Sequence, residues 1–277
     1  MRVLISPDRI ALSGDGTYNM ALDKVLFEAF ECFKVPSLRF YCFDKPTITI
    51  PIRYDGSDLC PTQIASDKIK LSRRISGGKY LLHQLGLTYA LIMPKGHPSI
   101  DGLGLKESYR KLSQPIFNAL KQLNSSVDFL SCTIGMKQNK DCALETEVES
   151  MGINGVKFVG AAQKRGRYCL IQHGEIQLLS SLIGLGNYLR DGIARETLGL
   201  DTKFNLSDFK TSSKLVCQPE PRVDDNSRLV NLLREKVASN ILIECEKVFG
   251  ERHYHQLEST LINRAMECRR EFEIVLK

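Results

Sequence analysis

Apolar side chains recur at helical spacing in two parts of the chain. In the first part they stand at positions i, i+3, i+4, i+7 and i+11, namely Leu22, Val25, Leu26, Ala29 and Phe33. This spacing is one face of an amphipathic helix, so we predict a helix over 19–33. Similar spacing predicts a second helix over 106–123. Pro115 either starts that helix late or kinks it, because proline has no backbone N–H.

Alternating or β-branched residues predict strands over 37–43, 47–52 and 87–93. An Asp-Lys-Pro turn separates the first two, and Pro94 closes the third. Together with the helices, these strands indicate a mixed α/β protein.

The dipeptide Asn154-Gly155 suits the two positive-φ positions of a type I′ hairpin turn. We therefore predict that it joins strands over 148–153 and 156–161. A polar, mobile loop over 163–167 should lead to a further strand over 168–178. Antiparallel hairpins are thus expected to dominate the sheet.

The pattern predicts a main domain over 1–201 and a linker over 202–226, where periodicity is lost and Ser, Asp and Pro gather. A helical C-terminal extension over 227–277 should follow, with one helix ending near Gly250 and another over 257–275. The predicted fold is a largely antiparallel mixed sheet flanked by helices.

Composition narrows the possible functions. The chain is 43% hydrophobic and 25% charged, which is typical of a globular protein, and no stretch approaches the roughly 20 apolar residues of a membrane span. The N-terminus has no secretory pattern, so we expect a cytoplasmic protein. The net charge of +6 comes from scattered Lys and Arg, which makes nucleic-acid binding a weak interpretation. An evenly solvated surface with a modest bias and an acidic protein partner fit equally well. The nine cysteines include no CxxC pair, so neither a disulfide framework nor a metal site is expected.

The first candidate for chemistry is the stretch 73–83, RRISGGKYLLH. The adjacent glycines Gly77 and Gly78 let backbone N–H groups approach an anion or a thioester closely. Arg73 and Arg74 could donate to phosphate or carboxylate. The alternative is a glycine turn with solvated arginines.

The second candidate is Lys157, two residues past the hairpin tip and followed by small residues. Strand alternation places it on the face of Val159 and Ala161, opposite Phe158. A lysine beside small side chains has room to meet a ligand. The alternative is a solvent-exposed strand lysine.

These two segments resemble a known family. The stretch 73–91 (RRISGGKYLLHQLGLTYAL) resembles RRxTGGxAVLHDxELTYS, and the stretch from Lys157 (KFVGAAQKRGRYCLIQHG) resembles KxxGSAQxRxxxxxxQHG, both of the octanoyltransferases and lipoate-protein ligases. NMALD at 19–23 matches the first helix of that family, and the motifs are collinear from about Gly14 to Leu178.

The resemblance implies an α/β fold shared with biotin protein ligases. It also implies attachment of octanoyl or lipoyl groups to a lysine of a lipoyl carrier domain. The implied acceptors are lipoyl domains of 2-oxoacid dehydrogenase complexes or a glycine cleavage H-type protein. Transferases take the acyl group from a donor such as acyl carrier protein and need no cofactor, whereas ligases activate free lipoate with ATP and Mg.

One cysteine favours the transferases. Their nucleophilic cysteine lies fifteen residues before the motif lysine, and that position here is Cys142. The Asn-Asp pair of the ligases is absent. The resemblance therefore implies Cys142 as nucleophile, with Lys157 and the Gly77-Gly78 backbone lowering its pKa and holding the oxyanion. His83 would position or deprotonate the incoming amine. The substrate-binding residues implied are Arg73, Arg74, Ser76, Gly77, Gly78, Lys79, Gly160, Ala161, Ala162, Gln163 and His173.

The chain departs from the transferase pattern in three places. No Phe or Pro-Ser step follows Cys142, and Gln84 replaces the aspartate after the motif histidine. Lys79 replaces the third glycine of the ligases, which argues against close nucleotide approach. Two alternatives stay open: an ATP-dependent lipoate-protein ligase acting through lipoyl-AMP, and a non-catalytic homologue that binds lipoyl domains. Biotin ligation is disfavoured because the basic glycine stretch after Gln163 follows the lysine motif.

Overall fold

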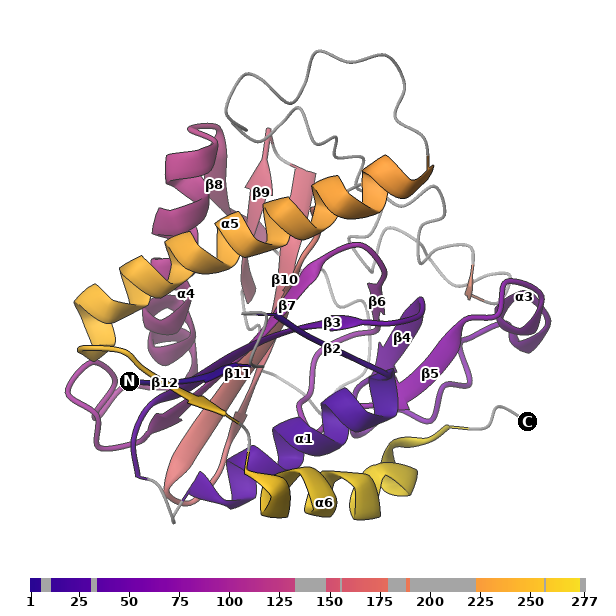
Figure 1. Ribbon diagram of the computed structural model, residues 1–277, viewed down its shortest axis with the longest axis horizontal. Coiled ribbons are helices and arrows are strands. Elements are labelled where there is room, and N and C mark those ends of the chain that lie inside the picture. Colours follow the sequence, from indigo (N-terminus) through magenta and orange to yellow (C-terminus); the bar gives the residue numbers. More distant parts are fainter. Residues whose placement is uncertain are drawn as a thin grey trace, which may run out of the picture.

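The computed structural model describes residues 1–5, 11–30, 34–132, 148–154, 156–178, 188–189, 223–256 and 258–274. Over this part of the chain, a nine-stranded sheet forms the centre of the molecule (Figure 1). Eight of its strands follow one another in the order β12 (His253–Gln256), β1 (Arg2–Ile5), β3 (Ser37–Phe43), β7 (Leu87–Pro94), β11 (Cys169–Ile176), β10 (Val156–Arg165), β9 (Val148–Ile153) and β8 (Val127–Cys132). β2 (Ala11–Gly14) pairs with β3.

Antiparallel pairing joins the strands from β3 to β8, while β1, β2 and β12 pair in parallel. The predicted mixed, largely antiparallel α/β fold is confirmed. β12 was not predicted. It pairs with β1 in the register Arg2↔His253, so the C-terminal extension is not wholly helical.

A second, three-stranded sheet packs beside the first. Its order is β5 (Lys70–Arg73), β4 (Thr47–Ile50), β6 (Leu81–His83), and α3 (Pro61–Ser66) lies next to it. The predicted strands over 37–43 and 47–52 both form, but they belong to different sheets. This small sheet carries the stretch singled out for chemistry.

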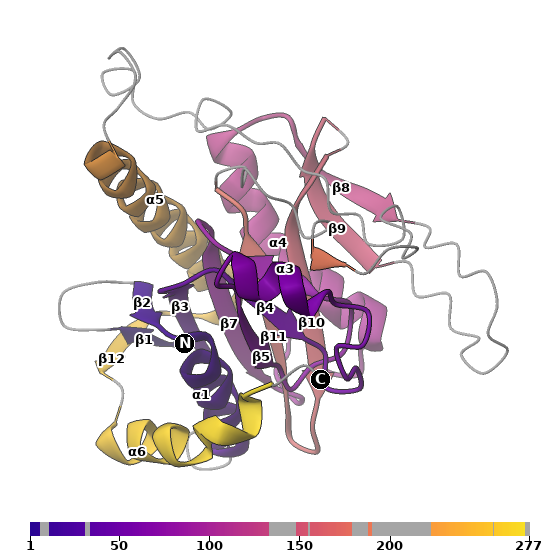
Figure 2. The ribbon, with the colours of Figure 1, turned by 90° about the vertical axis from the view of Figure 1, so that its right-hand side faces the viewer.

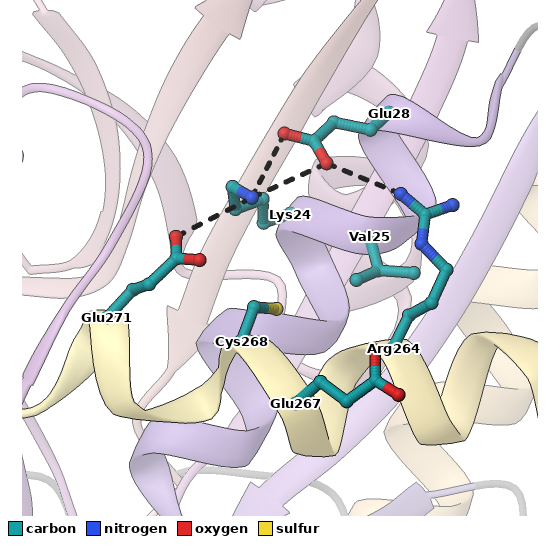
Figure 3. A pocket seen from close by; sticks show the side chains of 7 residues that line it. All are labelled: Lys24, Val25, Glu28, Arg264, Glu267, Cys268 and Glu271. Atoms are coloured by element: carbon teal, nitrogen blue, oxygen red, sulfur yellow. Dashed lines mark hydrogen bonds and ion pairs between the residues drawn. The ribbon is translucent and has the colours of Figure 1, made fainter.

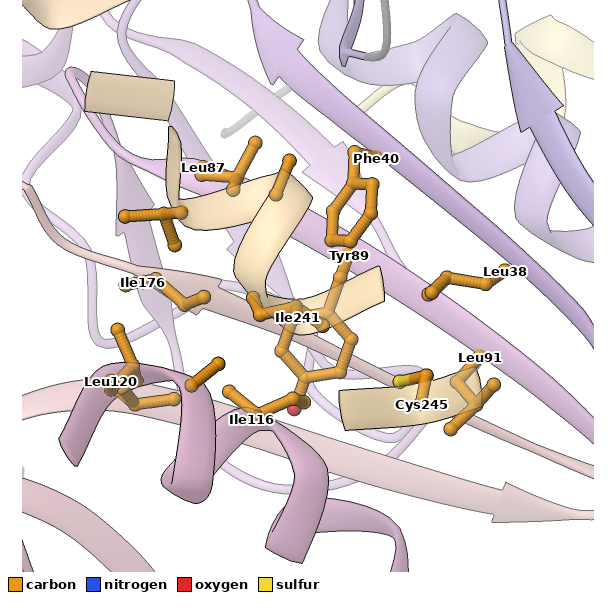
Figure 4. Packing of buried hydrophobic residues seen from close by; sticks show 14 of the residues in the cluster. Leu38, Phe40, Leu87, Tyr89, Leu91, Ile116, Leu120, Ile176, Ile241 and Cys245 are labelled. Atoms are coloured by element: carbon orange, nitrogen blue, oxygen red, sulfur yellow. The ribbon is translucent and has the colours of Figure 1, made fainter. Parts of the chain in front are cut away.

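Alternation along β3 and β7 sends side chains to two separate apolar cores. Leu38 and Tyr89 point to the core that α4 (Leu105–Leu123) and α5 (Val223–Phe249) cover, and Figure 4 shows Ile116 and Ile241 of these helices around Tyr89. On the other face, Ile92 joins the core covered by α1 (Gly16–Glu28) and α6 (Ser259–Cys268). α1 and α6 lie side by side in both ribbon views (Figures 1 and 2).

The predicted helices form with shifted ends. α1 begins at Gly16, before the first apolar position, because the Asp15 carboxylate accepts the Tyr18 N–H at 3.0 Å and caps the helix. α4 begins at Leu105 and contains Pro115, so the proline does not delay its start.

The hairpin prediction is confirmed, since β9 and β10 pair around Asn154, whose φ is 52°. The predicted mobile loop over 163–167 is wrong, because β10 continues to Arg165 and pairs with β11. Its polar side chains have partners on α4. The Arg165 guanidinium donates to Ser108 Oγ at 2.8 Å, and Ser108 Oγ donates to Gln163 Oε1 at 3.2 Å.

The C-terminal helices pack on the two cores. α5 begins at Val223, so the last residues of the predicted linker are helical, while 201–222 lie outside the described residues. Val237 and Ile241 of α5 share a core with the sheet, whereas the division into domains stays a prediction. No helix in the described ranges is long and apolar enough to cross a membrane.

Candidate functional site

Arg74 binds the inner side of the glycine loop, which we define as Ser76–Lys79. Its guanidinium is buried and donates from Nη2 to Gly77 O at 2.8 Å and to Lys79 O, and from Nη1 to Thr49 O at 3.0 Å. Burial lowers the pKa of Arg74 to about 10. We expected this arginine to bind an anion, but its donors hold the backbone of its own chain.

Arg73 holds a neighbouring loop in the same way. Its Nη1 donates to the carbonyl oxygens of Ile52 at 3.2 Å and Tyr54 at 2.5 Å. The side chain is half-buried. The two arginines therefore fix the backbone around the glycines.

The glycine loop turns the N–H group of Gly78 outward. Carbonyl and N–H of one trans peptide point in opposite directions. Because Gly77 O points inward to Arg74, the N–H of Gly78 points away from it. Gly78 has a φ of +91°, which only glycine adopts readily, and both glycines are exposed. The loop can therefore offer a backbone donor to an anion.

A β-bulge lies between Lys157 and Val159. Both Phe158 and Val159 consequently pack into the α4 side of the sheet, and strict alternation is lost at this point. A Cβ built on Gly160 would lie 3.8 Å from Lys157 Cε and 3.5 Å from Leu81. Lys157 thus shares its face with Gly160, which corrects the expectation that it shares one with Val159 and Ala161.

The bulge divides the predicted substrate residues between two faces. Ala162 lies under the glycine loop, 3.7 Å from a Cβ built on Gly78. Ala161 packs against the core beneath α4, and Gln163 bonds to Ser108 of α4. Gly160 and Ala162 therefore border the candidate site, whereas Ala161 and Gln163 lie across the sheet from it.

His173 links the glycine loop to α1. Its Nε2 lies 2.5 Å from Ser76 Oγ, and its Nδ1 lies 2.8 Å from Asp23 Oδ2. All three side chains are buried. His173 is therefore a partner of the loop and not an exposed ligand group.

Asp23 is the centre of a buried ion pair that the motifs did not predict. Its carboxylate accepts from Arg39 Nη1 at 2.8 Å and from the Tyr41 hydroxyl at 2.9 Å. Burial and the charge of Asp23 raise the pKa of Tyr41, so its hydroxyl stays protonated and donates. The signals in the sequence are the NMALD match at 19–23, which ends in this aspartate, and its place within the apolar face of a helix, beside Leu22 and Leu26.

His83 lies in a second buried chain. Its Nδ1 is 2.9 Å from Glu175 Oε2 and its Nε2 is 3.0 Å from Thr49 Oγ1. The ring stacks on Phe43 with centroids 4.0 Å apart, and only 3% of the residue is exposed. Thr88 also donates to Glu175. Both ring nitrogens are thus occupied, and the acid–base role that the resemblance implies stays a prediction.

Cys142 and Lys79 are the remaining predicted residues of the site. Cys142 lies outside the described residues, so its position relative to Lys157 is a prediction. Lys79 is half-buried at the loop, and burial lowers its pKa. Among the residues that the structure describes, no group of three or more His, Cys, Asp or Glu could hold a metal ion.

A groove between α1 and α6 lies on the outer side of α1 (Figure 3). Its volume is about 290 Å³, and an ion pair crosses it from Lys24 Nζ to Glu271, which follows α6, at 3.6 Å. Arg264 of α6 reaches Glu28 at 3.7 Å, and Lys24 pairs with Glu28 within α1 at 3.2 Å. The Lys24–Glu271 and Arg264–Glu28 pairs tie the C-terminal segment to α1, the helix that carries Asp23.

The family of the protein follows from its match to a family model. A family model described as the lipoyl protein ligase A/B catalytic domain matches residues 15–200, more than half of the chain. The chain belongs to this family.

Curated relatives agree with the family. An octanoyltransferase LipM of Oceanobacillus iheyensis is 32% identical over 168 residues, which cover 59% of this chain and 60% of that protein. One from Carboxydothermus hydrogenoformans is 32% identical over 170 residues, 59% of this chain and 61% of its own. The chain thus matches about three-fifths of the length of these relatives.

Solved structures share the fold. A lipoate-protein ligase A bound with ATP superimposes with a TM-score of 0.66 at 15% identity, covering 98% of this chain and 94% of that one. A bi-partite lipoate protein ligase from Thermoplasma acidophilum, described with its E2 lipoyl domain, gives a TM-score of 0.67 at 17% identity, with 94% and 91% covered. At these identities the likeness concerns the fold.

Proposed function

We propose that this chain transfers an octanoyl or lipoyl group to a specific lysine of a lipoyl carrier domain through an acyl-cysteine intermediate on Cys142. The observation that carries the proposal is the meeting of two distant motifs, since Gly78 lies against Ala162 and Lys157 lies beside Gly160 on the same face of β10. The relatives named octanoyltransferase support the choice of reaction.

The first step forms an acyl-cysteine. The Cys142 thiolate attacks the carbonyl carbon of a carrier thioester, such as an acyl carrier protein, and the carbonyl oxygen becomes an oxyanion. The Gly78 N–H and the Lys157 ammonium stabilise this charge. The carbon–sulfur bond to the carrier then breaks, and the carrier leaves as a thiolate.

The second step forms the amide. The neutral amine of the acceptor lysine attacks the carbonyl carbon of the acyl-cysteine, and the carbon–sulfur bond breaks to release Cys142 as thiolate. The amine proton passes to water, which protonates the carrier thiolate released in the first step. The carrier thioester is exchanged for the acyl-cysteine thioester and then for a more stable amide. The reaction therefore needs no nucleotide to activate the acyl group. The acceptors we propose are lipoyl domains of 2-oxoacid dehydrogenase complexes or a glycine cleavage H-type protein.

A ligase reaction through lipoyl-AMP is the second candidate. It is favoured by the outward N–H group of Gly78, which could also bind a phosphate, and by the shared fold with a ligase bound with ATP. Lys79 in place of a third glycine counts against it. ATP and Mg would be required only in this case.

Intact mass spectrometry separates the candidates. The protein is incubated with octanoyl carrier protein, or with free octanoate and MgATP, each with and without a lipoyl domain. An octanoyl adduct on Cys142 from the thioester, passed on to the lipoyl domain, is expected. Acylation only with ATP and no adduct would indicate the ligase, and no turnover in either reaction would indicate a non-catalytic homologue.

Cysteine variants provide the control. Cys142→Ser should form no acyl-enzyme and lose transfer. Cys268→Ser is the matched variant, because burial raises the pKa of the Cys268 thiol and makes it a poor nucleophile. It should keep both the adduct and the transfer. Full transfer by Cys142→Ser would exclude the covalent route.

A further inference from the structure

Two polar chains run from one strand to the glycine loop. His173 and Glu175 stand two residues apart on β11 and therefore face the same side, toward α1 and the small sheet. The first chain is Asp23–His173–Ser76. The second is Glu175–His83–Thr49–Arg74, and Arg74 ends it on the carbonyl oxygens of the loop.

The carboxylates of Asp23 and Glu175 determine which atoms donate and which accept hydrogen bonds along both chains. An ionised carboxylate only accepts, so the Nδ1 atoms of His173 and His83 carry the protons. In the neutral imidazoles each Nε2 then accepts a hydroxyl hydrogen, from Ser76 in one chain and from Thr49 in the other. Thr49 Oγ1 in turn accepts from Arg74 Nη1 at 3.2 Å. Leu81 O also lies within reach of Thr49 Oγ1, at 3.5 Å, so His83 Nε2, at 3.0 Å, is the nearer acceptor for this hydroxyl.

These hydrogen bonds determine which backbone groups the glycine loop turns outward. Arg74 draws Gly77 O inward, which turns the Gly78 N–H outward, and Ser76 is held at its hydroxyl by His173. Every side chain in the two chains is at most 5% exposed, so water does not compete for these bonds. A donor fixed in this way needs no reorganisation when charge develops near it.

We propose that the two carboxylate–imidazole–hydroxyl chains position the glycine loop so that the Gly78 N–H meets the developing oxyanion. The proposal rests on the proposed function for the identity of that oxyanion. Thr49, Ser76, Asp23 and Glu175 are positioning residues, and His83 is one as well, acting through Thr49 and Arg74. None of them has to touch the acyl group.

The test compares Thr49→Val with Thr49→Ser. Valine keeps the shape of threonine but removes the hydroxyl that joins Arg74 to His83, whereas serine keeps the hydroxyl. For octanoyl transfer we expect Thr49→Val to lower kcat at least about tenfold with KM within about threefold, because the N–H acts mainly in the transition state. Thr49→Ser should stay within about threefold of the wild-type kcat.

Ser113→Ala, on α4 against the other face of β11, is the matched control. Ser113 of α4 is buried and accepts from the Gln172 amide at 2.9 Å, so its loss also breaks a buried bond to a hydroxyl. The melting temperature of the Ser113→Ala variant should fall, while its kcat for octanoyl transfer should stay unchanged. The proposal is overturned if Thr49→Val keeps its kcat, or if Ser113→Ala loses as much kcat as Thr49→Val at equal loss of thermal stability.

Combining variants tests whether both chains act on one loop. Ser76→Ala cuts the first chain and should also lower kcat. In the double variant Ser76→Ala/Thr49→Val, the fold-loss of kcat should be smaller than the product of the two single fold-losses. Each single variant already releases the same glycine loop. If the two fold-losses of kcat multiplied, the two chains would act independently, which would contradict a shared action on the glycine loop.

Hydrogen exchange tests the loop without relying on activity. We expect amides in a peptide spanning residues 74–82 to exchange faster in Thr49→Val than in Ser113→Ala or wild type. If the wild type transfers no acyl group but this difference is present, the proposed function fails and the positioning network stands. Equal exchange in both variants overturns the network.

Discussion

Replacing Arg39 with methionine leaves a buried carboxylate without its cationic partner. Arg39 and Asp23 are both 0% exposed, and their closest N···O distance is 2.8 Å. Removing one member of such a pair typically costs about 3–5 kcal/mol, mainly because the other charge is left uncompensated. Tyr41 and His173 still donate to Asp23, so we expect the lower end, about 3 kcal/mol.

Urea and thermal unfolding measure this cost. For a chain of this size, about 3 kcal/mol corresponds to a fall in melting temperature of roughly 6–12 °C. Arg252→Met is the matched control, because Arg252 pairs with Glu246 at 3.6 Å at the surface, where a pair is worth under about 1 kcal/mol. Adding Asp23→Asn to Arg39→Met removes the stranded charge and should recover at least about 1 kcal/mol.

Two results would refute this reasoning. A loss below about 1 kcal/mol for Arg39→Met would mean that the carboxylate is not charged and desolvated in the folded protein. An additive loss in the double variant would mean that the cost lies in the lost packing of the arginine and not in the unpaired charge.

Three further predictions concern separate parts of the fold. In Gly86→Ala the new Cβ would lie 1.9 Å from Glu175 Oε1, so we expect lower thermal stability and slower acyl transfer, measured by melting and by steady-state kinetics. Asn154→Ala should cost roughly 1 kcal/mol in urea unfolding, because φ is +52° there, whereas Asn154→Gly should be nearly neutral; equal losses would contradict this. The Lys247 ammonium lowers the pKa of Glu244, so the stability from this group is present above the unfolded pKa and is lost as pH falls through the folded one. Glu244→Gln should therefore cost about 1–2 kcal/mol at neutral pH and flatten the loss of stability in acid, and an unchanged acid profile would refute the assignment.

Local patterns were enough to predict the elements whose partners are near in sequence. The hairpin at Asn154, β3 and β7 depend on alternation and turn chemistry within a few residues. β12 could not be found in this way. All four of its residues are exposed and its partner β1 lies at the other end of the chain, so nothing local marks it.

The site was predicted in part for the same reason. The motifs singled out the glycine loop and Lys157, because glycine and lysine are unusual in a strand-rich context, and their role in the reaction stays a prediction. The division of β10 into two faces was missed, since one bulge after Lys157 reverses the alternation for every later residue. Strand alternation alone therefore placed Ala161 on the face of Lys157, whereas it packs on the opposite face.

The buried charges argue for a role beyond holding the fold together. Replacing buried ion pairs with apolar side chains is often neutral or stabilising, so an ion pair and two carboxylate–imidazole pairs inside one layer are a poor way to gain stability. Here they gather on one face of the main sheet, and both imidazole chains end at the glycine loop. The other face, under α4 and α5, holds an apolar core in which the buried polar groups that contact the sheet, such as Gln172 and Ser113, are uncharged. A network that served stability alone would have no reason to be confined to the face next to the loop, whereas one that holds the loop in a single arrangement has to lie there.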